Sequence, residues 1–378
     1  EIAQSVQHPP AAADTTLPVP RGFMTRADLR RYRLRTQAPS HADYRGYDVY
    51  GMAPSSSGGS TVGEALNILE EFELSGMPAP EALHHYLEAS ALAFADRGAY
   101  LGDPAYVDVP LRDLLSQRFA RERACEIGAT AIAKPTEPAD VTDYDGVCGA
   151  PAATTGAAED TENVSTTNLT ATDRWGNVAE YTLTIEQTGG SGIVVPRRGF
   201  LLNNELTDFS TVYDPDDPNR IQPGKRPRSS MSPTIVLRDG EPFLALGSPG
   251  GSTIITTVLQ LLVGHLDQGL SLPRAIAAPR ASQRNTATVT AEPAFIEAFG
   301  PALEDTYGHD LVLSGDGLTS DPDIGAATAI RFGPRGRVVA VEGRDDERRV
   351  QLDHPGDGAV ARGGAPHRLR GGLREVRA

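Results

Sequence analysis

The segment that decides the fold reads STTNLTATDRWGNVAEYTLTIE and spans residues 165–186. Threonine and valine recur over residues 168–174 and 178–185, and this composition predicts two strands. The intervening DRWGN, residues 173–177, is typical of a hairpin turn. Upstream, residues 130–165 carry Pro, Asp, Gly, Thr and Ala with little periodicity. A structureless stretch of that length is unusual in a compact domain unless it is functional or disordered, and a site of chain cleavage would account for it.

Thr166 stands where this linker meets the first predicted strand. A threonine in that place is usually an ordinary strand residue. If the chain were cut before Thr166, the same residue would gain a free α-amino group with a pKa of about 7.7–8.0. That amine could accept the proton that a threonine hydroxyl must lose to become a nucleophile. One residue would then supply both nucleophile and base.

A glycine-rich turn, GSPGGS at residues 247–252, lies between a strand predicted at 243–246 and a helix predicted at 254–266. A further strand is predicted at 234–237. The glycines would let backbone N–H groups at the helix start approach a ligand and stabilise an oxyanion. An ordinary strand-to-helix turn is the alternative. A phosphate cradle is a weaker alternative, because the lysine of a P-loop is missing.

Two polar clusters could together hold the two ends of an amino acid. Glu205 and Asp208 follow an apolar run and could bind an ammonium group. Ser229 and Ser230 precede a predicted strand and could donate hydrogen bonds to a carboxylate. Solvated turns are the alternative, and the residues taken alone favour it.

The first half of the chain is predicted to be mainly helical. A strand over 47–52 is followed by helices that begin near Ser60 or Thr61, cover 83–94 and cover 111–127. The second half is rich in strands, with helices against them. The sequence therefore predicts an α+β protein built as a layered sandwich.

Composition excludes some classes of partner. The 378 residues include 35 Lys and Arg against 50 Asp and Glu, a formal charge of −15, and an acidic surface argues against nucleic-acid binding. No run approaches the roughly 18 apolar residues of a membrane helix. The chain begins at Glu1 rather than Met, so we expect an N-terminal portion to be missing. Cys125 and Cys148 could form one bridge or stay unpaired, and two cysteines are too few for a zinc site.

Several motifs, in order along the chain, resemble those of the γ-glutamyltransferase family. In the first half they are DYRG at 43–46, SSGG at 56–59 and YLGDP at 100–104. In the second half they are TT at 166–167, DRWGN at 173–177, GSGI at 190–193, LLNNELTDF at 201–209, KRP at 225–227, SSMSP at 229–233 and GSPGGS at 247–252. Motifs in series are more specific than any one of them.

The resemblance implies an N-terminal-nucleophile hydrolase fold, a four-layer αββα sandwich, formed by a precursor that cuts itself between Ser165 and Thr166. Residues 1–165 would be the C-terminal part of a large subunit, and residues 166–345 an associated small subunit. We expect residues 346–378 to be a disordered tail. The family implies a secreted, periplasmic or cell-surface protein, with no cofactor and no metal.

The implied reaction is attack by Thr166 on the γ-glutamyl amide of glutathione or another donor. The acyl group would then pass to water or to an amino acid or dipeptide. The resemblance assigns catalytic roles to Thr184, Gly250 and Gly251. It assigns donor binding to the ammonium-holding Glu186, Glu205 and Asp208 and to the carboxylate-binding Ser229 and Ser230.

Three departures from the family pattern stand out. Asn168 occupies a position where the family usually has histidine, which could slow processing or do little. The stretch from Asp208 to Ser229 is short for the family's lid loop, and an open cleft would accept larger donors. The arginine that grips the donor carboxylate has no counterpart here. The alternatives are a related acylase acting on a cephalosporin side chain, and a non-catalytic protein that never processes.

Overall fold

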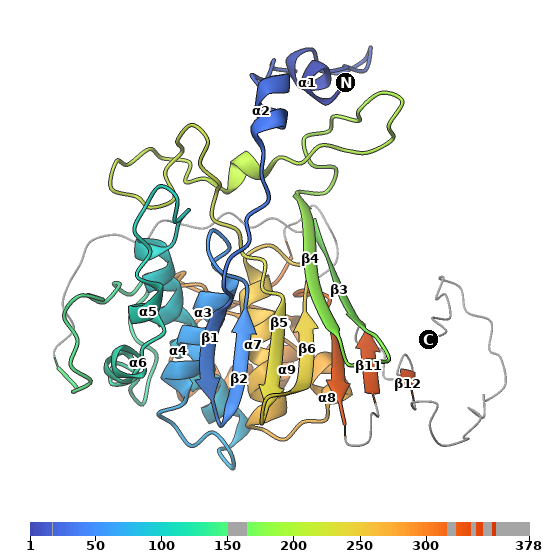
Figure 1. The fold of residues 1–378 in the computed structure, drawn as a ribbon. Coiled ribbons are helices and arrows are strands. Elements are labelled where there is room, and N and C mark those ends of the chain that lie inside the picture. The colour runs from blue at the N-terminus through green and yellow to red at the C-terminus, as the bar shows by residue number, and fades with distance from the viewer. Residues whose placement is uncertain (17, 150–164, 316–322, 334–337, 343–349, 353–378) are drawn as a thin grey trace.

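The fold centres on one seven-stranded antiparallel sheet (Figure 1). The computed structural model describes the chain apart from residues 17, 150–164, 316–322, 334–337, 343–349 and 353–378. Across the sheet the strand order is β1-β2-β5-β6-β10-β11-β12. These strands span Ser40–Tyr44, Tyr47–Gly51, Thr234–Arg238, Glu241–Gly247, Thr328–Phe332, Val338–Glu342 and Val350–Leu352.

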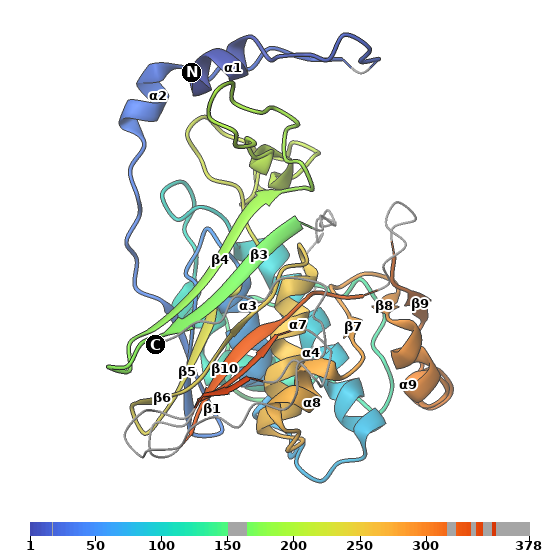
Figure 2. The same ribbon diagram turned by 90° about the vertical axis from the view of Figure 1, so that its right-hand side faces the viewer.

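Helices cover one face of this sheet and form the apolar core with it (Figure 2). The central helices are α3 (Gly58–Leu69), α4 (Ala79–Tyr100) and α7 (Thr253–Leu266), with α6 (Gln117–Ala124), α8 (Leu272–Ala277) and α9 (Pro293–Asp305) packed around them. Val49, Val236 and Leu244 are neighbours in register on β2, β5 and β6, and all three are buried in this core. Burial of such rows of apolar side chains is the main stabilising contribution to the fold.

The hairpin of β3 (Ser165–Thr172) and β4 (Val178–Glu186) lies on the other face of the sheet and contacts β6 and β10 (Figure 2). Its two faces differ. Asn168 and its neighbours at alternate positions face the sheet, whereas Leu169, Tyr181 and Leu183 are 47–55% exposed. This alternation is the period of two that a strand imposes on its side chains.

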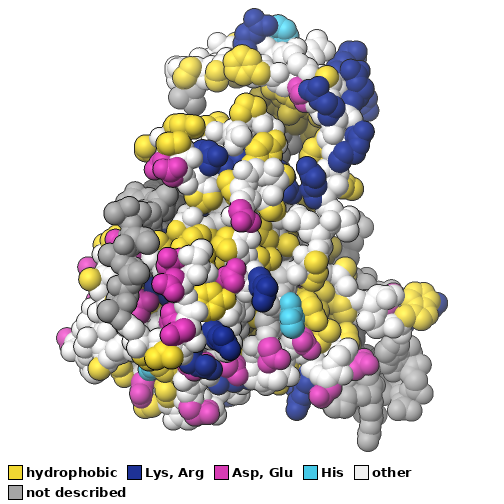
Figure 3. All heavy atoms as spheres, turned by 60° about the vertical axis from the view of Figure 1, so that its left-hand side comes forward, with side chains coloured by type: hydrophobic (Ala, Val, Ile, Leu, Met, Phe, Trp, Pro, Cys, Tyr) yellow, Lys and Arg dark blue, Asp and Glu magenta, His cyan; other side chains and the backbone are white. Residues whose placement is uncertain are grey.

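Smaller elements complete the described residues. A three-stranded sheet joins β7 (Ala281–Ser282), β8 (Val289–Ala291) and β9 (Leu311–Leu313). The short helices are α1 (Ile2–Gln7), α2 (Arg26–Arg31), α5 (Leu111–Leu114) and the 3₁₀ turn η1 (Glu205–Asp208). The N-terminal segment with α1 and α2 stands away from the sheet, and Figure 3 shows basic side chains gathered in the upper part of that view.

The predicted hairpin, the strands at 234–237 and 243–246 and the helix at 254–266 are confirmed, with ends shifted by a few residues. The predicted helix over 111–127 is wrong as one element. It is two helices, α5 and α6, interrupted at Leu115 and Ser116. The interruption is held by α3, because Asn67 Nδ2 donates to Leu115 O and Gln117 Nε2 donates to Asn67 O.

The two preceding helices are longer than predicted. Helix α3 begins at Gly58 rather than near Ser60 or Thr61, and α4 runs from Ala79 to Tyr100. The start of α3 is closely packed, because a Cβ on Gly58 would lie 2.4 Å from Met231 O. The segment before β5 therefore leaves room only for glycine at the first residue of α3.

The expected four-layer sandwich is only partly present in the described residues, which form three layers: helices, the large sheet and the β3-β4 hairpin. Strand β12 lies inside the range 346–378 that we predicted to be a disordered tail, and residues 353–378 lie outside the described residues. Ser165, the first residue of β3, stands immediately before the predicted cut, and residues 150–164 of the linker lie outside the described residues.

Of the two possibilities for the cysteines, the structure contains the bridge. Cys125 follows α6 and is joined to Cys148, with a Cα–Cα distance of 5.6 Å. The bridge closes a loop that includes the first part of the linker. No helix in the described part of the chain has the length and apolar character that crossing a bilayer needs.

Candidate active site

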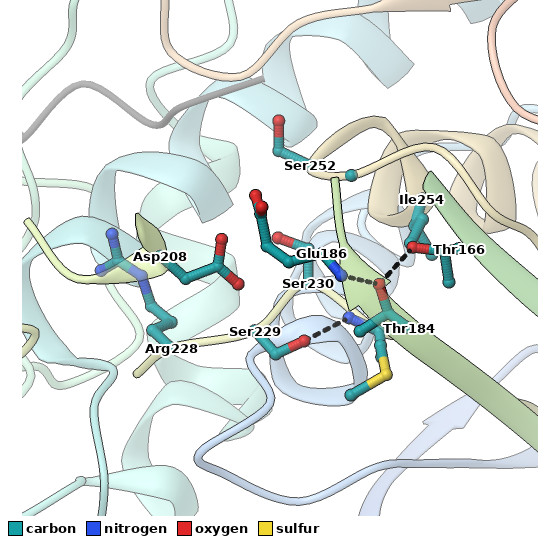
Figure 4. A pocket seen from close by; sticks show the side chains of 11 residues that line it. Thr166, Thr184, Glu186, Asp208, Arg228, Ser229, Ser230, Ser252 and Ile254 are labelled. Carbon is teal, nitrogen blue, oxygen red and sulfur yellow. Dashed lines mark hydrogen bonds between the residues drawn. The ribbon is translucent and has the colours of Figure 1, made fainter. Parts of the chain in front are cut away.

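A cavity lies where the end of the β3-β4 hairpin meets the turn before α7 and the segment before β5 (Figure 4). Parts of the chain far apart in sequence meet here. The residues that line it are Thr166, Thr184, Glu186, Asp208, Arg228, Ser229, Ser230, Met231, Gly251, Ser252 and Ile254. Seven of them are predicted site residues, and two others, Glu205 and Gly250, are neighbours that do not line the cavity themselves.

Thr166 and Thr184 are directly opposite each other on β3 and β4. The Thr166 hydroxyl donates to Thr184 Oγ1 at 3.1 Å, and the backbone N–H of Glu186 donates to the same oxygen at 2.8 Å (Figure 4). A register shift between Ser165 and Thr166 marks the start of the ladder. Strand pairing therefore fixes the orientation of the Thr166 hydroxyl at the cavity wall.

The turn after β6 places backbone groups on the same side of the cavity as the Thr166 hydroxyl. Gly250 and Gly251 have φ values of +136° and +58°, which favour glycine. Thr253 Oγ1 donates to Gly250 O at 2.7 Å, and the backbone N–H of Ala326 donates to Ser248 Oγ at 3.1 Å. The turn is thus tied to both α7 and the segment before β10. It presents the start of α7, where backbone N–H groups lack partners within the helix.

Carboxylates form a second wall. Glu186 ends β4 in a left-handed conformation, φ +76°, and Asp208 ends η1. Glu205, one turn before Asp208, has its pKa raised to about 7 by burial and by the nearby charge of Glu186. A cation entering beside these three carboxyl groups would be stabilised by their charge and would favour ionised Glu205.

The two serines are positioned by the large-subunit side of the predicted cut. Arg97, at the end of α4, donates from Nε to Ser57 Oγ at 2.8 Å and from Nη2 to Ser230 Oγ at 3.0 Å. Ser57 in turn donates from Oγ to Ser229 O at 2.7 Å. The serine segment therefore lies against a buried guanidinium at the start of α3 and the end of α4.

Five contributors to the site were missed by the sequence analysis. Met231 and Ser252 lie inside motifs that were recognised and Arg228 lies between two of them, so only their individual roles were missed. Ile254 is the second residue of α7. Arg97 gave no signal that set it apart, because helix α4 buries other charged side chains as well, among them Glu88 and Asp96.

A separate polar cluster offers groups that could ligate a metal: His84, Glu88 and His309. Lys134 Nζ already contacts Glu88 Oε1 at 2.5 Å, and the ring nitrogens His84 Nδ1 and His309 Nε2 are hydrogen-bonded at 2.9 Å. Burial and the nearby His84 and Lys134 lower the pKa of His309 to about 3. A neutral histidine pair next to a lysine–glutamate ion pair accounts for this cluster.

Comparison with known proteins identifies similar sequences. A family model described as Gamma-glutamyltranspeptidase matches residues 1–353. The glutathione hydrolase proenzyme of Bacillus subtilis subsp. natto is 41% identical over 261 residues, 68% of this chain and 44% of that protein. The acylase ACY 1 proenzyme of Pseudomonas sp. (strain SE83) is 32% identical over 348 residues, 91% of this chain and 56% of that protein. The chain spans about half the length of the curated relatives it matches.

Solved structures give the same grouping. The cephalosporin acylase from Bacillus halodurans matches with a TM-score of 0.73 at 28% identity, covering 88% of this chain and 55% of that one. The chain thus shares the mixed helix-and-strand fold of N-terminal-nucleophile hydrolases.

Proposed function

Because this chain belongs to the gamma-glutamyltranspeptidase family, as its motifs predicted, we propose that it is part of a self-processing enzyme of γ-glutamyl hydrolysis and transfer. The observation that carries the proposal is the hydroxyl of Thr166, held by Thr184 at the head of a strand and facing a cavity with carboxylates and serines on its walls. No metal or other cofactor is needed for the chemistry below.

Processing begins with the Thr166 hydroxyl, whose oxygen adds to the carbonyl carbon of Ser165. The Ser165–Thr166 C–N bond breaks as an ester forms, and water then hydrolyses the ester. The products are a carboxylate on Ser165 and a free α-amino group on Thr166. The α-amine is the base that the nucleophile needs.

In the processed enzyme, the α-amine of Thr166 takes the hydroxyl proton as the oxygen attacks the γ-amide carbon of the donor. The C–N bond of that amide breaks, and the leaving amine takes the proton. Water or the amine of an amino acid or dipeptide then attacks the ester. Backbone N–H groups at Gly250 and Gly251 stabilise the oxyanion in both steps.

Donor binding uses the opposite character of the cavity walls. Glu186, Glu205 and Asp208 hold the donor's α-ammonium group, and Ser229 and Ser230 donate to its α-carboxylate. With both ends of the amino acid held, the γ-carbonyl is placed at the remaining wall, where Thr166 lies. Glutathione and other γ-glutamyl compounds fit this description.

The two products of the cut, residues 1–165 and 166–345, stay associated as large-subunit and small-subunit parts. Strand β2 pairs with β5 along its whole length, and Arg97 contacts Ser230, so contacts cross the cut at the sheet and at the site. Such an interface resembles a domain core rather than a transient contact.

The fourth layer of an αββα sandwich would cover the exposed face of the β3-β4 hairpin. Support comes from Leu169, Tyr181 and Leu183, which are apolar and exposed there, and from the share of its relatives' length that the chain spans. Export to an oxidising compartment is supported by the Cys125–Cys148 bridge.

The second candidate is an acylase that removes a side chain without an α-ammonium group. The similarity to an acylase proenzyme over 91% of the chain favours it. The carboxyl groups of Glu186 and Asp208 in the cavity wall, with Glu205 beside them, oppose it. Two chromogenic amides separate the candidates: γ-glutamyl-p-nitroanilide and glutaryl-p-nitroanilide, which differ only in the α-ammonium group. We expect kcat/KM of the full-length, processed protein to be at least about 100-fold higher for the γ-glutamyl amide. A preference for the glutaryl amide would overturn the γ-glutamyl assignment in favour of the acylase.

A further inference from the structure

The inner face of the β3-β4 hairpin carries a buried polar cluster beyond the site itself. Asn168 Nδ2 donates to Glu180 Oε1 at 2.7 Å and to Thr328 Oγ1 at 2.8 Å. Thr182 Oγ1 donates to Asn168 Oδ1 at 2.8 Å, and the hydroxyls of Thr170 and Thr328 are 3.3 Å apart. The cluster thus joins both hairpin strands to β10 of the large sheet.

The same cluster lies directly over β6. Thr328 is paired with Gly247 in the sheet. A Cβ on Gly247 would lie 2.2 Å from Asn168 Oδ1 and 2.7 Å from Glu180 Oε1, closer than real side chains approach. Glycine at this position therefore lets the amide and carboxyl groups reach the sheet backbone, and the hairpin sits at a defined height over β6 and β10.

This contact connects the two pieces of backbone that must meet in the reaction. Asn168 is two residues from Thr166 and on the same face of β3. Gly247 ends β6 and leads directly into the turn with Gly250 and Gly251. A shift of the Asn168–Glu180 pair would therefore move the nucleophile relative to the proposed oxyanion-binding turn, and misplacement on the order of 1 Å is enough to slow catalysis about 100-fold.

We propose that Asn168 and Glu180 form a positioning pair that holds Thr166 at the correct distance from the Gly250–Gly251 turn. The pair touches neither the donor nor the reacting atoms. It acts through the hairpin, and it explains how asparagine serves at a position where the family motif has histidine: a carboxyl group on the neighbouring strand accepts its amide hydrogen. The inference rests on the proposed function.

Exchange of the amide and carboxyl groups tests the pair in the full-length precursor. In Asn168→Asp two carboxyl groups face each other, and at pH 8 we expect self-cleavage at least about tenfold slower than in the wild type. In the double variant Asn168→Asp with Glu180→Gln, the amide of Gln donates to the carboxylate of Asp. We expect that variant to recover cleavage to within about threefold of the wild type, because the effects of two substitutions in direct contact are not additive.

Kinetics of the processed protein distinguish positioning from donor binding. For Asn168→Asp we expect kcat for γ-glutamyl-p-nitroanilide to fall while KM stays within about twofold, because the donor-binding groups lie elsewhere. Glu241→Gln is the matched control, since Glu241 is an exposed carboxylate on β6. It should process and turn over as the wild type does.

Two results would overturn the pair: wild-type cleavage by Asn168→Asp, or a slow Asn168→Asp that Glu180→Gln does not rescue. If Asn168→Asp fails to fold, recovery of folded, cleaved protein in the double variant supports the pair and its absence overturns it. Thr166→Ala, run in parallel, separates the two proposals. If Thr166→Ala is cleaved, the proposed nucleophile is wrong. If Thr166→Ala stays whole while Asn168→Asp behaves as the wild type, only the positioning pair is wrong.

Discussion

The two interfaces of the large sheet are built from opposite kinds of side chain. On the helical side, Val49, Val236 and Leu244 form a dry apolar row against α3 and α7. On the hairpin side, Asn168 donates one hydrogen bond to Glu180 within the hairpin and one to Thr328 of the sheet. An apolar interface tolerates small shifts, whereas hydrogen bonds require particular distances. The helical side accounts for stability, and the hairpin side accounts for the position of Thr166.

Removal of the nucleophile should have the largest effect on the hairpin side. We expect Thr166→Ala to leave the precursor whole and to lower hydrolysis of γ-glutamyl-p-nitroanilide by at least about 1,000-fold. The midpoint of thermal unfolding should change little, because the substitution removes a small, half-buried side chain. Thr167→Ala is the control: its side chain is exposed on the opposite face of β3, and its effect should be milder. Equal losses from both variants would contradict the assignment of Thr166.

Truncation of the apolar row should have the largest effect on the helical side. Leu244→Ala removes a fully buried side chain from the core, and we expect a loss of about 2–5 kcal/mol in the free energy of unfolding. In the same chain, Leu183→Ala removes a leucine that is 55% exposed on the hairpin, and the loss should be below about 1 kcal/mol. Denaturant titration of both variants measures the difference. In the full-length protein, a large loss of unfolding free energy for Leu183→Ala would instead support the layer proposed to cover the exposed face of the β3-β4 hairpin.

Donor binding should depend on the protonation of Glu205. Burial and the charge of Glu186 raise the pKa of Glu205 to about 7, so the carboxyl group is neutral below that pH and attracts an ammonium group less. We expect KM for the donor to rise as pH falls below about 7, by up to about tenfold per pH unit. Glu205→Gln should raise KM at pH 8 and remove this dependence. A KM that is independent of pH in the wild type would contradict the prediction.

The smallest effect concerns the stability of the hairpin contact. Burial raises the pKa of Glu180 to about 7, although hydrogen bonds from Thr170 and Asn168 act in the opposite direction. The folded state therefore favours the neutral carboxyl group, and its contribution is complete below about pH 4.5 and lost as pH rises through about 7. Between pH 5 and pH 8 the wild type should lose about 1–3 kcal/mol more unfolding free energy than Glu180→Gln. An equal loss of unfolding free energy in the wild type and in Glu180→Gln would contradict this assignment.

The two sides of the sheet also differ in how far sequence could predict them. The hairpin, β5, β6 and α7 follow from local patterns: alternating strand residues, the DRWGN turn and an apolar helical run. Thr166 and Ser230 were found because they lie in motifs, and Glu186 because the family resemblance assigns it a role. The interruption of the predicted helix at Leu115 could not be found in this way, because its cause is Asn67 on another helix. Arg97 was missed for the same reason, since only tertiary packing brings the end of α4 to Ser230.

The most direct test of the account is an intact mass spectrum of the full-length precursor after purification and incubation. We predict two chains, the smaller beginning with Thr166, and a single uncut chain for Thr166→Ala. A wild-type protein that stays whole, or a smaller chain that begins at another residue, would contradict the central claim that Thr166 is the nucleophile released by self-cleavage.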